Sequence, residues 1–228
     1  MLKPPNWKKQ KQHLKIKLDR FFLICFTPQM VSYPPILFIP PFLYFNCCGL
    51  IYSGQGWAQN DGWESSSDYC EWYGVTCLNG TLVSQISLMG NLLNGSISSS
   101  LGSLSNLKKL YLRNNQLNGS IPSSLGSLSR LDTLYLGRNQ LSGPIPSSLG
   151  SLSNLQTLDL CLNLLSGSIP SFRSAVSLKS FTLQNNQLTG VTIESIPPNA
   201  FSPCNLRDNP FHCPIPSFVK YDCFASCT

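Results

Sequence analysis

Histidine is almost missing from this chain of 228 residues, which contains only His13 and His212. A catalytic nucleophile needs an adjacent general base that a third group orients, and neither histidine has a convincing partner in the sequence. Carboxylates are also sparse, and Asp132 and Asp159 lie too far apart in sequence to indicate an acid and base pair. These shortages predict a non-enzymatic protein with no catalytic residues.

Metal-binding patterns are scarce for the same reason. The one cluster of zinc-type ligands combines His212 with Cys204, Cys213, Cys223 and Cys227. The gaps between these cysteines are eight, nine and three residues, and none is the CxxC pair that makes a structural zinc site recognisable. We therefore expect disulfides here, with no metal site and no cofactor.

Net charge is missing from most of the chain, although the formal total is +6. Seven of the sixteen basic residues and one acidic residue lie in the first 20 positions, which leaves nine basic and nine acidic residues in the remainder. A polyanion requires a basic surface, and this balance supplies none. The composition therefore excludes nucleic acid as a partner.

Charged residues are absent from Phe21 to Tyr52. An apolar stretch after a basic one is typical of a secretory signal or a membrane anchor, so we expect residues 1–56 to be a leader. Five prolines disfavour a continuous spanning helix, because each removes a backbone donor: Pro28, Pro34, Pro35, Pro40 and Pro41. A cleaved leader, a membrane tether and a mispredicted start with initiation at Met30 all stay open.

In contrast to histidine, cysteine is frequent in this chain, which contains ten. Three lie in the leader. Six of the other seven lie at the two ends of a central repeat array: Cys70, Cys77, Cys204, Cys213, Cys223 and Cys227. This clustering predicts disulfide-stapled caps in an oxidising compartment. Cys161 is left over at an outward strand position, either as a tolerated small residue or as a reactive or intermolecular contact. Three glycosylation sequons, at Asn79, Asn94 and Asn118, fit the same compartment.

A block of about 24 residues recurs through the middle of the chain. Its copies start at Val83, Leu107, Leu131, Leu155, Leu178 and Phe201. Within one copy, a short alternating strand is followed by a glycine-containing turn and then by leucines spaced for a short helical or 3₁₀ turn. One such unit cannot bury its apolar face alone, so the period predicts an α/β repeat solenoid whose strands form a parallel sheet.

Asparagine occupies one fixed offset of every copy. Such an amide can donate to and accept from backbone groups of adjacent turns, which indicates a structural ladder rather than a binding site. Its members are Asn91, Asn115, Asn139, Asn163, Asn186 and Asn209.

The repeat resembles the plant-type leucine-rich repeat, LxxLxLxxNxLxGxIPxxLGxLxx, over residues 83–190. Three consecutive copies keep the glycine and the Ile-Pro pair, as in Gly143, Ile145 and Pro146, whereas Ser98 stands where the first copy should have proline. The resemblance implies a curved array with a concave parallel sheet, 3₁₀ turns on the convex side and a second small sheet near the LxGxIP segment.

The flanks extend this resemblance. Residues 62–77 are similar to the N-terminal cap of such extracellular proteins, which implies that Cys70 pairs with Cys77 and that Trp72 and Val75 cover the first coil. The resemblance gives a cap at 57–82, five repeats at 83–200, and a degenerate sixth repeat with a cysteine-rich cap at 201–228. Four cysteines in that last cap allow three pairings, and the sequence does not choose among them.

The outward strand positions carry the candidate binding residues. Tyr111 and Tyr135 should be neighbours one coil apart, flanked by cations, which is a composition favoured at interface anchors. The alternative is that the two tyrosines only support packing between strands. The predicted partner-binding set on the concave face is Lys109, Tyr111, Arg113, Tyr135, Arg138, Asp159, Thr182 and Gln184.

The resemblance implies extracellular or membrane-tethered recognition of a protein or peptide ligand. No kinase sequence follows Thr228, so we expect a receptor-like or co-receptor-like protein without a kinase. Two alternatives are an inhibitor of a secreted cell-wall hydrolase, as in the polygalacturonase-inhibiting proteins, and a structural cell-surface protein. The residues indicate neither the ligand nor the oligomeric state.

Overall fold

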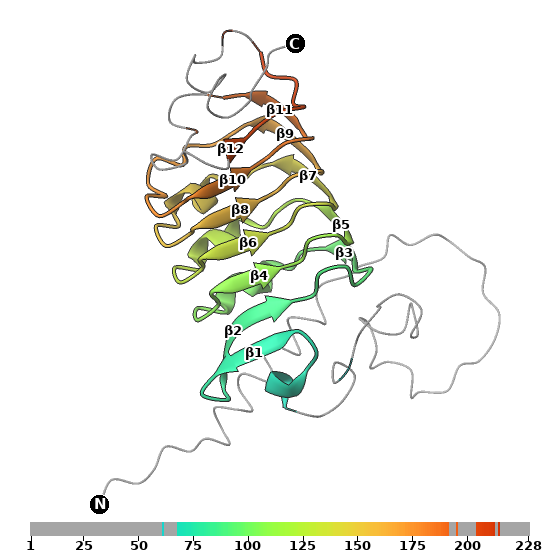
Figure 1. The fold of residues 1–228 in the computed structure, drawn as a ribbon, viewed down its shortest axis with the longest axis vertical. Coiled ribbons are helices and arrows are strands. Elements are labelled where there is room, and N and C mark those ends of the chain that lie inside the picture. Colours follow the sequence, from blue (N-terminus) through green and yellow to red (C-terminus); the bar gives the residue numbers. More distant parts are fainter. Residues whose placement is uncertain (1–60, 62–67, 192–194, 196–203, 213, 215–228) are drawn as a thin grey trace, which may run out of the picture.

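The repeat copies stack as coils of a solenoid in a computed structural model, which describes residues 61, 68–191, 195, 204–212 and 214 (Figure 1). Each coil places one strand in a seven-stranded sheet, in the order β1-β2-β4-β6-β8-β10-β12. Only the β1 and β2 pair is antiparallel. The strands are β1 (Val75–Leu78), β2 (Leu82–Ser87), β4 (Lys109–Tyr111), β6 (Thr133–Tyr135), β8 (Thr157–Asp159), β10 (Ser180–Thr182) and β12 (Cys204–Asn205).

The parallel sheet that the period predicts is therefore confirmed, including its degenerate sixth copy. Phe181 of β10 pairs with Cys204 of β12, so the cysteine takes the strand position that isoleucine, leucine or phenylalanine holds in the preceding coils. Strand β1 is an addition from the N-terminal cap that the repeat alone did not predict.

A second, five-stranded sheet runs along the other side of the coils, as the family resemblance implies (Figure 1). Its order is β11-β9-β7-β5-β3, so β3 is an edge strand. Each strand contains the glycine of the LxG segment, and at Gly119 the backbone has φ +71°, a conformation that resists larger residues. The strands are β3 (Asn94–Ser96), β5 (Gln116–Gly119), β7 (Gln140–Pro144), β9 (Leu164–Ser168) and β11 (Gln187–Gly190).

Short 3₁₀ turns join the two sheets, as predicted: η3 (Ser99–Ser103), η4 (Ser123–Ser127) and η5 (Ser147–Ser151). Turn η3 begins differently from the others, because the hydroxyl of Ser98 accepts a hydrogen bond from the amide of Ser100 where η4 and η5 begin after proline. The turns stack tightly. A Cβ atom added at Gly150 would lie 1.9 Å from the Ser171 carbonyl oxygen, so no larger residue fits.

Leucine side chains fill the space between the sheets, and most of them have no exposed surface. Burying one leucine stabilises the fold by about 2 kcal/mol, and stacked coils gain this for every layer. The fourth coil is one residue shorter than the three before it. Phenylalanines enter the core there, with the rings of Phe172 and Phe181 5.0 Å apart.

Asparagine side chains connect adjacent coils at the end of the first sheet. Asn139 donates from Nδ2 to the carbonyl oxygens of Leu112 and Leu136, at 3.0 and 2.9 Å, and its Oδ1 accepts from the amide of Leu117 at 3.0 Å. The same pattern recurs at Asn115, Asn163, Asn186 and Asn209. Each amide thereby satisfies backbone groups that the irregular turn would leave unpaired.

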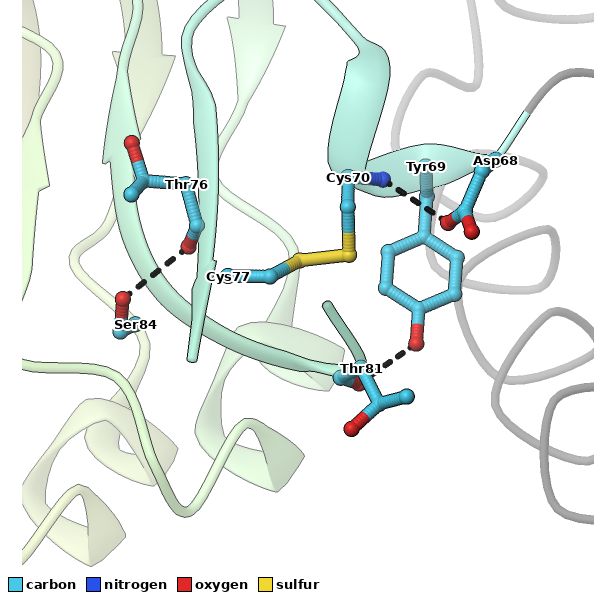
Figure 2. The surroundings of a disulfide bond; sticks show 7 residues. All are labelled: Asp68, Tyr69, Cys70, Thr76, Cys77, Thr81 and Ser84. Atoms are coloured by element: carbon cyan, nitrogen blue, oxygen red, sulfur yellow. Dashed lines mark hydrogen bonds between the residues drawn. A yellow bond between two sulfur atoms is a disulfide. The ribbon is translucent and has the colours of Figure 1, made fainter. Parts of the chain in front are cut away.

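The N-terminal cap closes the first coil, and Figure 2 shows its disulfide. Cys70, in turn η2 (Tyr69–Glu71), is bonded to Cys77 in β1, which confirms the pairing implied by the family. The phenol of Tyr69 donates to the carbonyl oxygen of Thr81 at 2.5 Å, and burial raises the pKa of this phenol. Trp72 is 7% exposed and belongs to the core. The cap thus covers the apolar end of the stack.

The C-terminal cap is described only in part. Cys204 is buried and disulfide-bonded. Cys213, Cys223 and Cys227 lie outside the described residues, so their pairing stays a prediction. The predicted leader, residues 1–56, also lies outside them. Within the described ranges, no helix has both the length and the apolar character needed to span a membrane.

Candidate functional site

Strand register brings the outward residues of successive coils into rows across the first sheet. Tyr111 pairs with Tyr135, and Tyr135 pairs in turn with Asp159, which pairs with Thr182. The two tyrosine rings are half-buried, with centroids 5.1 Å apart and planes tilted by 55°. Tilted aromatic pairs at this distance stabilise each other by about 1 kcal/mol. The predicted tyrosine neighbours are therefore in contact, and part of each ring still faces solvent.

An ion pair reaches across two coils beside the tyrosines. The guanidinium of Arg113 donates from its Nη1 to Oδ2 of Asp159, which is 46 residues later in the sequence. In the coil between them, Gly137 occupies the repeat position that Arg113 holds in its own coil. A Cβ atom at Gly137 would lie 2.7 and 2.9 Å from the two carboxylate oxygens of Asp159, so the absence of a side chain leaves the space that the carboxylate occupies.

Asp159 is held on its other side as well. Its Oδ1 accepts hydrogen bonds from the backbone amide of Cys161 at 3.1 Å and from the hydroxyl of Thr182 at 3.3 Å. Asp159 is 4% exposed, whereas the Arg113 side chain is 36% exposed. Within the predicted set, Asp159 therefore contributes by fixing Arg113, and Arg113 presents the accessible surface.

Cys161 lies two residues after the end of β8 and is only 2% exposed, so the residue that its sequence offset predicts to face outward is covered. Burial, a hydrogen bond to Asp159 and the charge of that carboxylate raise the pKa of the thiol to about 12. A thiol reacts as its thiolate, and at neutral pH this one is protonated. The structure thus favours the tolerated small residue over the reactive contact.

The remaining predicted residues lie on the strands of the first sheet or in the segments just after them. Lys109 is half-buried at one end of β4, and Arg138 is exposed with a left-handed backbone, φ 55°. Gln184 is half-buried, and its Oε1 atom has no hydrogen-bond partner within the described residues. We use the name concave patch for Lys109, Tyr111, Arg113, Tyr135, Arg138, Asp159, Thr182 and Gln184 together.

Gly137 is the one contributor to this arrangement that sequence reasoning missed. Its signal was present, because glycine stands at a strand offset where the other coils have Arg113, Cys161 or Gln184. A gap in an otherwise filled row indicates that a neighbouring side chain lies across it. The identity of that neighbour required the register and the direction of the Asp159 side chain.

A groove of about 750 Å³ lies away from the concave patch, against the second sheet. It is lined by serine, isoleucine and proline of three successive coils and contains no charged residue. Among the described residues, no group of histidine, cysteine and carboxylate side chains could hold a metal ion. Neither surface has the constellation that nucleophilic catalysis requires.

Comparison with known families agrees with the repeat. The Leucine rich repeat N-terminal domain matches residues 59–78, Leucine Rich repeats (2 copies) match residues 105–153, and Leucine Rich Repeat matches residues 154–174. No curated protein sequence matches the chain.

The chain is also similar to several solved structures. The BIR2 ectodomain from Arabidopsis thaliana is 36% identical, with a TM-score of 0.57 over 63% of this chain and 77% of that one. A chain of the BIR3–SERK2 complex from Arabidopsis thaliana is 31% identical, with a TM-score of 0.56 over 70% of this chain and 85% of that one.

The leucine-rich repeat ectodomain of the Arabidopsis thaliana receptor kinase GASSHO1/SCHENGEN3 is also similar. It was solved in complex with CASPARIAN STRIP INTEGRITY FACTOR 2. The match is 32% identical, with a TM-score of 0.64, and it covers 88% of this chain and 22% of that longer one. With its N-terminal cap, its 24-residue period and these likenesses, the chain belongs to the plant-type extracellular leucine-rich repeat family.

Proposed function

We propose that this protein is a non-enzymatic, extracellular recognition module that binds a protein or peptide through the concave patch. It acts in a receptor-like or co-receptor-like way. The observation that carries the proposal is the pre-organised centre of the patch, in which the Tyr111 and Tyr135 pair lies beside an arginine fixed by Asp159. Side chains that are already ordered lose less conformational entropy on binding, so more of the contact energy remains as affinity.

Charge indicates what the partner should present. The concave patch contains three cations, Lys109, Arg113 and Arg138, against the single carboxylate of Asp159. Because that carboxylate is buried and already paired with Arg113, the accessible charge is positive. A partner with carboxylates around an apolar side chain complements this surface, with the apolar group against the tyrosine rings.

The similar structures support a protein or peptide partner. BIR3 was solved in complex with SERK2, and GASSHO1 with CASPARIAN STRIP INTEGRITY FACTOR 2. By likeness, this chain takes a partner of one of those two kinds, a second leucine-rich repeat ectodomain or a secreted peptide. The parallel strands of the first sheet number six, so about five spacings of 4.8 Å give a width of roughly 24 Å. This width suits one interface of about 800 Å² per partner.

Proximity labelling with the full-length chain in plant cells tests the proposal. The tagged wild-type protein should label a small set of extracellular proteins in a saturable way, and each purified member should bind with a measurable dissociation constant. The purified SERK2 ectodomain is the first probe to assay. Labelling confined to intracellular proteins, or no saturable partner at all, would overturn the proposal.

A further inference from the structure

We propose that Asn94 and Asn118 carry N-linked glycans whose first sugars lie in the groove beside the second sheet. The inference rests on the extracellular location in the proposed function, because only an exported chain meets the glycosylation machinery. It concerns a different face from the concave patch.

The ladder asparagines differ from Asn94 and Asn118 in how their side-chain amides are used. The ladder residues, such as Asn139 and Asn163, use their amide groups in several hydrogen bonds between coils. Asn94 and Asn118 are exposed, and their amide groups make no hydrogen bond within the described chain. The side-chain nitrogens of Asn94 and Asn118 are therefore accessible to another molecule. Both residues stand in Asn-Gly-Ser sequons, and exposed Asn79, between β1 and β2 of the cap, stands in a third sequon away from the second sheet.

The sequons occupy equivalent places in neighbouring strands. Asn94 and Ser96 lie in edge strand β3, and Ser96 pairs with Asn118 of β5. Buried Leu117 and Ile121 point to the core, so Asn118 and Ser120 between them face outward. The corresponding positions of later coils are Ser142, Ser166 and Thr189, which cannot be modified in this way. On the second sheet, the sequon asparagines thus lie only at the N-terminal end.

The groove begins at these sequons. The sequon hydroxyl residues Ser96 and Ser120 both line it, and their side chains make no hydrogen bond within the described chain. Further along, Pro122 and Pro144 supply apolar ring surfaces. A neutral sugar has hydroxyls on its edge and C–H groups on its faces, so a groove with serine hydroxyls, proline rings and no charge complements it. The covalent link to Asn118 holds the first sugars at this groove.

Strand β3 gives the glycans a protective role. The first sheet has its N-terminal edge covered by antiparallel β1, whereas the second sheet ends at β3 without a covering strand in the described chain. An open edge presents backbone donors and acceptors that can pair with another chain. A bulky, solvated glycan at Asn94 blocks that pairing.

The modification is one oligosaccharyl transfer. The side-chain nitrogen of asparagine forms a bond to C1 of the first sugar of a polyisoprenyl-pyrophosphate-linked oligosaccharide. The bond from C1 to the pyrophosphate oxygen breaks, the amide loses one proton, and the polyisoprenyl pyrophosphate leaves. No oxidant or reductant is involved.

The experiment expresses the full-length chain in plant cells, recovers it from the lumenal or medium fraction, and measures glycan occupancy at each asparagine by mass spectrometry. We expect occupancy at Asn94 and Asn118, loss of the second glycan in Ser120→Ala, and its retention in Ser120→Thr. Chain that is exported but unmodified at both sites overturns this inference and leaves the proposed function standing. Chain that never enters the lumen overturns both.

Amide hydrogen exchange tests where the sugars lie. Exchange across β3 should be at least several-fold slower in the glycosylated protein than in an unmodified Asn94→Gln/Asn118→Gln variant, while exchange in β8 should be equal in the two. Equal exchange across β3 in two otherwise folded proteins overturns the groove as the glycan's position.

Discussion

Ladder asparagines hydrogen-bond adjacent coils together, and half-buried Asn139 shows how one side chain contributes to the stability of a coil. It donates hydrogen bonds to the carbonyl oxygens of Leu112 and Leu136, in two adjacent coils, and accepts one from the amide of Leu117 in β5. Truncation leaves the amide of Leu117 unpaired, and it removes one of the two donors to each carbonyl, which keep their hydrogen bonds from Asn115 and Asn163. Because an unpaired buried group costs about 1–3 kcal/mol, we expect Asn139→Ala to lower the free energy of unfolding by about 1–3 kcal/mol in urea denaturation.

Asn118 provides the matched control, since it is the same residue type with an exposed, unpartnered amide. In unglycosylated protein, Asn118→Ala should change the free energy of unfolding by less than about 0.5 kcal/mol. Equal losses from both substitutions would refute the assigned structural role of the ladder.

Gly137 has no side chain, and this leaves room for the Asp159 carboxylate. In Gly137→Ala the new methyl group meets both Asp159 oxygens, so the carboxylate shifts and its bond to Arg113 weakens. We expect a loss of about 1–3 kcal/mol in the free energy of unfolding. In an Arg113→Ala background the same substitution should cost less, because the bond it breaks is already gone. Strictly additive losses in this double-mutant cycle would contradict the linkage between the three residues.

Cys161 should make stability depend on alkaline pH. Its thiol pKa rises from 9.0 to about 12 in the folded protein, so the folded state keeps a proton that the unfolded state loses above pH 9. Stability is therefore complete below that pH and falls by about 1.4 kcal/mol per pH unit above it. Lysines and tyrosines titrate in the same range, so the informative quantity is the difference between wild type and Cys161→Ala. Parallel pH curves for the two proteins would show that the thiol is not perturbed.

At the scale of secondary structure, the 24-residue period was sufficient to predict six strands in register and the turns that join them. It could not predict β1, because this strand belongs to the cap and pairs antiparallel by way of a hairpin at Asn79 and Gly80. The second sheet came from the family pattern, since three- to five-residue strands around glycine carry no alternation long enough to detect. The sequence pattern thus predicts the elements that recur in every coil, whereas an element that occurs once, such as β1, is found only from the structure.

The cap disulfide should stabilise one end of the stack selectively. Cys70 and Cys77 are seven residues apart, and closing so short a loop contributes about 2.5 kcal/mol by the chain-entropy estimate. In Cys70→Ser/Cys77→Ser, amide exchange should accelerate most in β1 and β2 and least in β8. The reason is that each coil contacts only its neighbours. A uniform acceleration through all coils would argue against local fraying of the cap.

At the scale of the whole molecule, the solenoid separates three surfaces with different properties. The interior is leucine and phenylalanine, the first sheet presents tyrosines and cations, and the second sheet presents serine, proline and sequon asparagines. Sequence offsets predicted which residues face outward on the first sheet. They did not predict that Asp159 and Cys161 are covered, because that depends on one side chain crossing the empty position of the neighbouring coil.

The central claim is that partners bind through the tyrosine pair, and saturation binding of a captured partner to three full-length proteins tests it most directly. Tyr111→Ala/Tyr135→Ala should raise the dissociation constant at least tenfold with a far-ultraviolet spectrum like that of wild type, since buried aromatic anchors contribute about 1–2 kcal/mol each. Tyr73→Ala, which removes an exposed tyrosine of the cap, should leave the dissociation constant unchanged. An unchanged constant in the double variant, or an equal loss in Tyr73→Ala, would contradict the account.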